Sequence, residues 1–137
     1  MVTNIAQAVA DTLNEQDFSV PFTAERVALP EFDLAAMQEL HVTVVPRQVD
    51  SEVLDRGRDA HDVKVDVAVQ KKVASIANEE IDPLLALVQE IADFLNRRNL
   101  DGAIWKKTEN NPVYSPEHLR EMRQFTSVLT ITYRVVR

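Results

Sequence analysis

His61 and its flanking aspartates form the group of side chains best suited to chemistry in this sequence. Asp59 and Asp62 surround His61, so an imidazole nitrogen and carboxylate oxygens are available in one short stretch. Mixed nitrogen and oxygen ligands of this kind suit a divalent metal ion. The alternative is a strand-start histidine beside solvated carboxylates. We favour the alternative, because neither His41 nor His118 stands at metal-site spacing from His61. We therefore predict no metal site.

The carboxylate pair Asp62 and Asp66 falls on one side of an expected strand. At about 3.3 Å per residue the two stand roughly 13 Å apart. Paired glycosidase carboxylates are roughly 5–9.5 Å apart. The serines are not set in a nucleophile elbow, and the two glycines, Gly57 and Gly102, are too few for a phosphate-cradling loop. We predict a protein that is not an enzyme, with no catalytic residues and no cofactor.

Two aromatic residues suggest binding rather than catalysis. Trp105 precedes Lys106 and Lys107, a combination that can stack on a nucleic-acid base and contact phosphate. The net charge of −7 disfavours a tightly held nucleic acid, because phosphate contacts dominate that affinity. A half-exposed strand aromatic is the favoured interpretation of Trp105. Tyr114 suits a surface anchor for a partner, but a packing role is favoured.

The elements that position these residues centre on His61–Val73. Its valines, at every second position from 63 to 69, lie on one side of an extended backbone, with polar residues and Ala68 on the other. This period of two predicts a half-buried strand. Gln124–Arg137 repeats the pattern with larger apolar residues. We expect the two to be long antiparallel strands of one sheet, with the apolar face inward and the polar face solvated.

Three further strands are expected. Phe22–Leu29 lies between Pro21 and Pro30 and is predicted to border the sheet, since proline suits a sheet edge. Leu40–Val45 alternates clearly and is predicted to end at Pro46. Ala103–Glu109 is predicted as the last short strand.

The main helix is predicted at Pro83–Arg98, with Asp82 as its N-cap and a preliminary turn over 78–81. Its broad apolar stripe suits a helix laid across a sheet. A helix at Thr3–Leu13, capped by Thr3 or Asn4, should open the chain. Ser115 should cap a short helix that ends near Gln124. A helical turn is expected at Asp33–Glu39.

These elements predict one α+β domain over residues 1–137. It should contain a mostly antiparallel, twisted sheet of about four or five strands, packed by the long helix. The stretch 47–60 is polar and lacks periodicity of its own, so we expect a long charged arm. Such an arm is either a solvated flexible loop or a partner-binding segment. Its charged residues are the candidate subunit-interface residues: Arg47, Asp50, Glu52, Asp55, Arg56, Arg58 and Asp59.

Composition sets the protein class. Cysteine is absent, which excludes disulfides and permits a reducing compartment. We expect neither a secretory signal nor a membrane span. Residues 1–93 hold 7 Lys or Arg against 18 Asp or Glu, whereas residues 94–137 hold 8 against 4. Such polarity suits head-to-tail stacking of copies. The favoured alternative places the two parts on different solvated faces.

The order of elements, with VTVVP at Val42–Pro46 and FTSVLTITYRV at Phe125–Val135, resembles the small neck proteins of tailed bacteriophages, and above all the tail terminators. The resemblance implies a hexameric ring in the virion neck, made in the host cytoplasm. The ring would cap the tail tube and dock on the head connector, with DNA passing through as cargo. The alternative function is a small cytoplasmic protein-binding or adaptor module. An enzyme with an unrecognised site ranks third.

Overall fold

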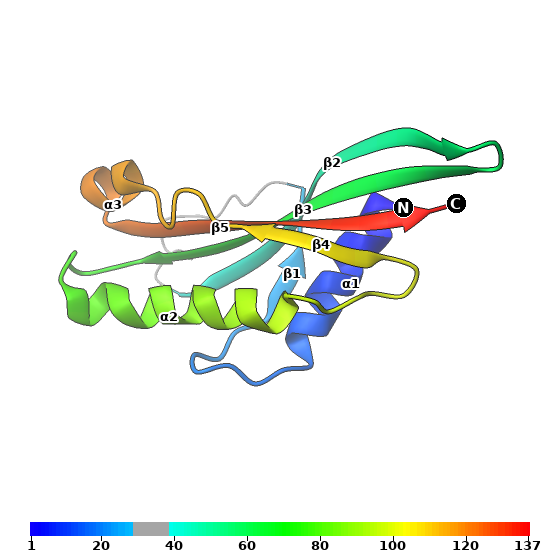
Figure 1. Ribbon diagram of the computed structural model, residues 1–137. Helices are drawn as coiled ribbons and strands as arrows, with labels where there is room; N and C mark the ends of the chain where they lie inside the picture. The colour runs from blue at the N-terminus through cyan, green and yellow to red at the C-terminus, as the bar shows by residue number, and fades with distance from the viewer. Residues whose placement is uncertain (29–38) are drawn as a thin grey trace.

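The computed structural model describes residues 1–28 and 39–137. The predicted α+β class is confirmed, with three helices and a five-stranded, mostly antiparallel sheet in this part of the chain (Figure 1). The elements in chain order are α1 (Val2–Asn14), β1 (Ala24–Arg26), β2 (His41–Asp55), β3 (Arg58–Lys72), α2 (Asn78–Leu95), β4 (Ile104–Glu109), α3 (Pro116–Met122) and β5 (Gln124–Val136).

The sheet has the strand order β1-β2-β3-β5-β4. β3 and β5 pair antiparallel along almost their whole length, with Val65 opposite Ile131, so the prediction of two long antiparallel strands is confirmed. β2–β3 and β4–β5 are also antiparallel, while β1 pairs parallel with β2. β1 is shorter than the predicted strand Phe22–Leu29, but it borders the sheet as expected.

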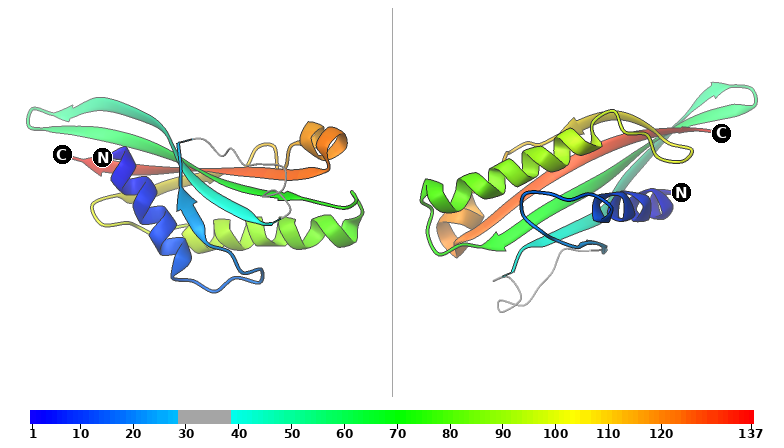
Figure 2. Two further views of the ribbon diagram at one scale, coloured as in Figure 1. Left: turned by 180° about the vertical axis from the view of Figure 1, so that it is seen from behind. Right: turned by 90° about the horizontal axis from the view of Figure 1, so that it is seen from below.

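One face of the sheet forms the core. The four alternating valines of β3 are fully buried, as are Leu129, Ile131 and Tyr133 on β5. α1 and α2 both cover this face, α1 beneath β1 and β2 and α2 beneath the other side of the sheet (Figure 2). Since burying a large apolar side chain is worth about 1.5–3 kcal/mol, this layer dominates the stability of the fold.

α2 lays a broad apolar stripe on the sheet, as predicted, with Leu84, Leu87, Ile91 and Leu95 buried. The predicted cap is wrong, because the helix begins at Asn78 after Ala77 and carries Pro83 within it. Three acidic residues in the first turns complement the positive end of the helix dipole. The preliminary turn is therefore part of the helix itself.

The two shorter helices agree with the sequence in position. α1 buries Ile5, Val9 and Leu13 in one stripe, but it starts at Val2 and no side chain caps it, so the predicted caps Thr3 and Asn4 are wrong. α3 has Ser115 as N-cap, whose hydroxyl accepts the amide hydrogen of His118. Residues 33–38 of the predicted turn Asp33–Glu39 lie outside the described residues.

Pro46 does not end its strand. β2 continues through it to Asp55, with an irregularity in register between Pro46 and Gln48. The reason lies in the sheet: β1 pairs with β2 only from Val42 to Val44, so no strand of the described residues pairs with the outer edge at Pro46. Proline is tolerated on an edge strand, where its missing N–H leaves no ladder bond unmade.

The segment 47–60, predicted to lack regular structure, is a β-hairpin. β2 and β3 run through it and turn at Arg56 and Gly57, with Val53 opposite Asp59. Every residue from 47 to 59 is exposed. A strand with both faces in water has no apolar side, so its period of two is absent from the sequence. The missing periodicity of this segment therefore reflects a solvent-exposed hairpin and not a loop.

Replacing Leu87 by alanine is expected to lower the free energy of unfolding by about 2–5 kcal/mol, because Leu87 is fully buried between α2 and the sheet. The matched control is Val53→Ala on the hairpin. Val53 is 80% exposed, so its truncation should change stability by less than about 0.5 kcal/mol. Chemical denaturation measures both, and similar losses in the two variants would contradict the proposed core.

Candidate subunit interface

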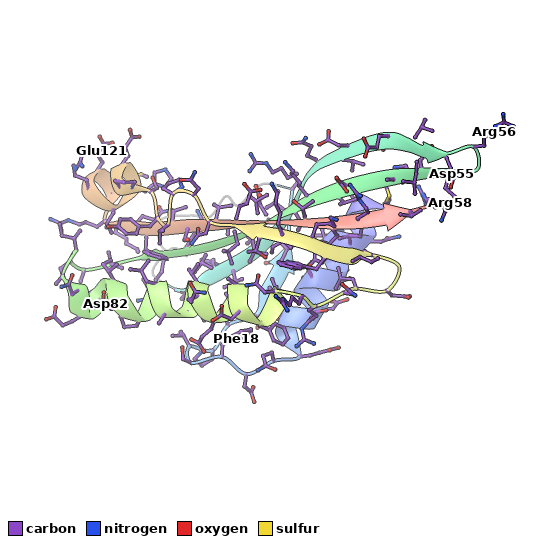
Figure 3. The ribbon with its side chains drawn as sticks, in the orientation of Figure 1. Phe18, Asp55, Arg56, Arg58, Asp82 and Glu121 are labelled. Carbon is purple, nitrogen blue, oxygen red and sulfur yellow. The ribbon has the colours of Figure 1, made fainter. Side chains whose placement is uncertain are left out.

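The arm, residues 47–60, is the most prominent projection of the molecule. Its tip extends beyond the helices, and Figure 3 shows Asp55, Arg56 and Arg58 at its end. Asp55 holds the turn by accepting hydrogen bonds from the Gly57 amide at 3.0 Å and from Arg58 Nε and Nη2 at 2.9 and 2.6 Å. The side-chain bond to Arg58 lowers the pKa of Asp55. The arm is therefore an ordered ribbon with a braced tip.

The predicted interface residues occupy the whole length of the arm. Arg47, at its base, reaches back to Asp66 of the sheet at 3.1 Å. Asp59 exchanges two backbone hydrogen bonds with Arg137, at 2.8 and 3.0 Å. Asp50 accepts a hydrogen bond from Gln48 at 2.8 Å. All seven predicted residues are exposed, so the structure brings them onto one ribbon without burying any of them.

The arm also exposes apolar side chains that the charge-based prediction missed. Val49, Val53 and Leu54 are 38%, 80% and 49% exposed. Val49 and Val53 lie on the same face of β2, because successive side chains of a strand alternate, and apolar exposure that gathers on one face is a common feature of contact sites. The signal in the sequence was the set of apolar residues at 49, 53 and 54 among the charges of the arm. These side chains add an apolar component to the candidate interface.

The sheet face opposite α1 and α2 is polar and crossed by ion pairs. Arg134 of β5 binds Asp62 of β3 through two bonds, at 2.8 and 3.1 Å. Asp66 accepts a bond from Thr130 at 2.7 Å and pairs with Arg47. These pairs tie β2, β3 and β5 together across their polar side, at the level where the arm leaves the body.

Hydrogen bonding sets the charge states on this face. The bond to Arg134, together with the positive charge of that residue, lowers the pKa of Asp62, against a smaller opposing effect of burial. The same bond raises the pKa of Arg134. Both groups stay charged through the neutral range. Their attraction is partly screened by solvent, since both side chains are about one third exposed.

The candidate metal ligands are not brought together. His61 lies opposite Ser51 of the arm, with Nδ1 2.6 Å from the serine hydroxyl. Asp62 is next in the strand and so points to the other face of the sheet, where it binds Arg134. In residues 1–28 and 39–137, no three His, Asp or Glu side chains are placed to hold a metal ion.

The two aromatic candidates have packing roles. The indole N–H of Trp105 donates to the Thr108 hydroxyl at 2.9 Å, and the ring is only partly exposed. The Tyr114 ring lies 6.1 Å from that of Phe125, which is fully buried. This agrees with the packing interpretation of both residues.

The sheet ends in two different edges. On one side, within residues 1–28 and 39–137, β2 has no outer partner beyond the short pairing with β1, and its arm portion carries Asp50 and Glu52. On the other side, β4 carries Lys106 and Lys107 along its outer edge. Lys107 pairs loosely with Glu109 at 3.3 Å, with both side chains about half exposed. The two edges therefore differ in charge.

A groove of about 440 Å³ lies between α2 and the β4–β5 side of the sheet. Leu85, Val88, Ala92 and Leu129 give it an apolar floor, and Thr108 of β4 stands at its lining. It thus opens beside the β4 edge, on the face that holds the core. An apolar hollow beside a free strand edge adds to the surface available for a partner.

Comparison with known proteins identifies no relative from which a function could be inferred. The sequence matches no protein-family model and shows no significant match to a curated protein. In the described part of the chain, none of the helices combines the length and apolar character that crossing a membrane requires.

Replacing Asp62 by asparagine is expected to reduce the pH dependence of stability at acid pH. The folded-state pKa of Asp62 is lowered, so its stabilisation is present above the unfolded-state pKa of about 3.9 and is lost as the pH falls through the lower folded value. The loss at neutral pH should be about 1 kcal/mol or less, because the pair is partly exposed.

Urea denaturation of both proteins between pH 7 and pH 2 measures this effect. The control is Asp93→Asn, which removes an exposed carboxylate on α2 that accepts a hydrogen bond from Gln89 and, among the described residues, forms no ion pair. Identical pH profiles for the wild type and Asp62→Asn would show that the bond to Arg134 contributes no linkage.

Proposed function

We propose that this protein is a structural component of a tailed-phage neck, a tail terminator that assembles into a ring. The ring caps the tail tube and joins it to the head connector, and DNA passes through as cargo. Function is carried by interfaces rather than by catalysis. The proposed location is the neck of the virion, and the proposed partners are other copies of the chain, the tail tube protein and the head connector protein.

The observation that carries this proposal is the exposed arm. A two-stranded ribbon is marginally stable in water without packing on at least one face. The tip of the arm, beyond the Asp59–Arg137 backbone bonds that join β3 to the end of β5, is such a ribbon, and it exposes Val53 and Leu54 to solvent. Packing against a neighbouring molecule removes that exposure, and a ring supplies one neighbour for every arm.

Charge distribution supports the same function. The acidic part of the chain, residues 1–93, supplies β1, β2 and β3, and the basic part supplies β4 and β5. Because the sheet order is β1-β2-β3-β5-β4, opposite charge preferences lie on its two sides. A subunit with unlike sides suits repeated contacts between identical copies. A net charge of −7 also favours DNA sliding past without being held.

The resemblance to phage tail terminators supports the specific assignment. It rests on the order of the elements, and the helix–sheet order seen in the structure keeps that sequence of elements. A ring protein of this type carries no catalytic residues, and the proposal therefore assigns none to this chain.

Light scattering on the purified protein, with negative-stain imaging, tests the proposal. We expect rings or higher-order oligomers, either alone or on addition of tail tubes, and binding to the tube end. A protein that remains monomeric at all concentrations, with and without tail tubes, would contradict it. A stable monomer or dimer with one tight unlike protein partner would instead indicate an adaptor module.

Replacing Asp55, Arg56, Arg58 and Asp59 together by serine is expected to weaken assembly while the monomer stays folded. These side chains are exposed and contribute to the tip of the arm rather than to the core. Circular dichroism checks the fold, and light scattering checks the assembly. The control replaces Glu79 and Glu80 at the exposed start of α2 by serine. Unchanged ring formation in the arm variant would remove the arm tip from the interface.

A further inference from the structure

We infer that subunits join edge to edge, with the arm portion of β2 in one copy adding as a strand to β4 of a second copy. The inference rests on the proposed function only in requiring that copies associate. It goes further by naming the two strands, their direction and their register. Exposed strand edges present unpaired backbone groups that readily accept another chain.

Strand direction favours this pairing. β2, β3, β5 and β4 lie side by side, and each neighbouring pair is antiparallel. A second copy placed so that the sheet continues puts its β2 next to β4 of the first copy. The two strands then run antiparallel, which extends the alternation of the sheet without reversing the subunit. The same contact repeats on every copy, so the interface is heterologous and suits a ring.

Charge selects this pairing over the two symmetric ones. Two β2 edges placed together would oppose Asp50 and Glu52 of one copy to the same carboxylates of the other. Two β4 edges would oppose Lys106 and Lys107 in the same way. Like charges directly opposite each other destabilise strand pairing, and unlike charges stabilise it. A β4–β4 contact escapes this repulsion only in the register that opposes Lys107 to Glu109 of the other copy, whereas the β2–β4 contact joins an edge with two carboxylates to an edge with two lysines.

The faces of the two strands also correspond. Asp50 lies opposite Asp62, and Lys107 opposite Thr132, so both belong to the polar face. Val49 lies opposite Val63, and Thr108 opposite Ile131, so these belong to the core face. Paired residues of an antiparallel sheet share a face.

One register satisfies both faces. With Asp50 of one copy opposite Lys107 of the next, Val49 meets Thr108 beside the apolar groove under α2. On the polar face, Glu52 then lies opposite Ile104, which is 56% exposed, because Lys106 is the extra residue at the register irregularity between Trp105 and Lys107. Glu109 falls opposite Gln48 rather than opposite a carboxylate. Shifting by two residues instead places Asp50 opposite Glu109, which is unfavourable.

Near Pro46, two features of the β2 edge limit its pairing with another strand. Pro46 lacks an N–H, and the register irregularity between Pro46 and Gln48 interrupts the strand. Both are devices that protect an edge from indiscriminate pairing. The ladder available to a second copy therefore begins at Gln48, and its usable length matches the six residues of β4.

Cysteine cross-linking tests the register directly, since the chain has no cysteine of its own. The double variant Asp50→Cys with Lys107→Cys should give, on mild oxidation, a ladder of disulfide-linked species beyond the dimer. Each single variant should stop at the dimer or below. The control pairs Asp93→Cys on α2 with Lys107→Cys and should give no ladder.

Charge reversal tests the same contact without a covalent bond. Asp50→Lys with Glu52→Lys should weaken self-association by about tenfold, and so should Lys106→Glu with Lys107→Glu. Mixing the two variants joins a reversed β2 edge to a reversed β4 edge and should restore association between unlike copies. All four positions are exposed, and circular dichroism confirms that each variant is folded.

The outcomes separate the two proposals. Oligomers that form without a cross-link ladder and are insensitive to both reversals overturn the edge pairing and leave the ring function standing. Copies that join through these edges but fail to bind tail tubes overturn the neck function and support the edge pairing. A protein that is monomeric alone and with tail tubes overturns both.

Discussion

The sealing of one sheet face by α1 and α2 is the constraint on which the rest of the structure depends. The valines of β3 are fully buried beneath these helices. The 15 residues of β3 span about 50 Å, whereas the 18 residues of α2 span about 27 Å. The helices therefore cannot cover the whole strand. The uncovered end of β2 and β3 becomes the arm, so the difference in rise between strand and helix creates the candidate interface.

The polar face of the sheet fixes geometry more than it adds stability. Arg134 donates hydrogen bonds from Nε and Nη2 to the two carboxylate oxygens of Asp62. Asp66 accepts hydrogen bonds from both Arg47 and Thr130. Exposed pairs of this kind contribute at most about 1 kcal/mol each. Their placement across three adjacent strands resists sliding of one strand past another, because each pair forms in one register only. The base of the arm is thereby held at a defined angle to the body.

In the proposed assembly, the two sheet edges, rather than the face covered by the helices, make the contacts between copies. The β2 edge carries Asp50 and Glu52 and ends in a charged ribbon that also exposes Val53 and Leu54, and the β4 edge carries two lysines beside an apolar groove. Rings of more than two identical subunits use heterologous interfaces, in which two unlike, complementary surfaces of each copy meet. The strand order thus places the charge polarity of the sequence on opposite edges of the sheet, which is the arrangement that the proposed assembly uses.

The sequence by itself determined the elements that bury a face. The period of two in His61–Val73 and the stripe in Pro83–Arg98 report burial, and the sheet and its covering helix followed from them. Only the tertiary structure decided the rest. Pro46 continues a strand because, in the described part of the chain, β1 does not extend to pair with it, and residues 47–59 belong to a hairpin although both of its faces meet water. Sequence periodicity arises where a strand or helix packs on a core. A strand held only by its neighbouring strands therefore shows no periodicity, and neither does the pairing of Asp62 with Arg134 across the sheet.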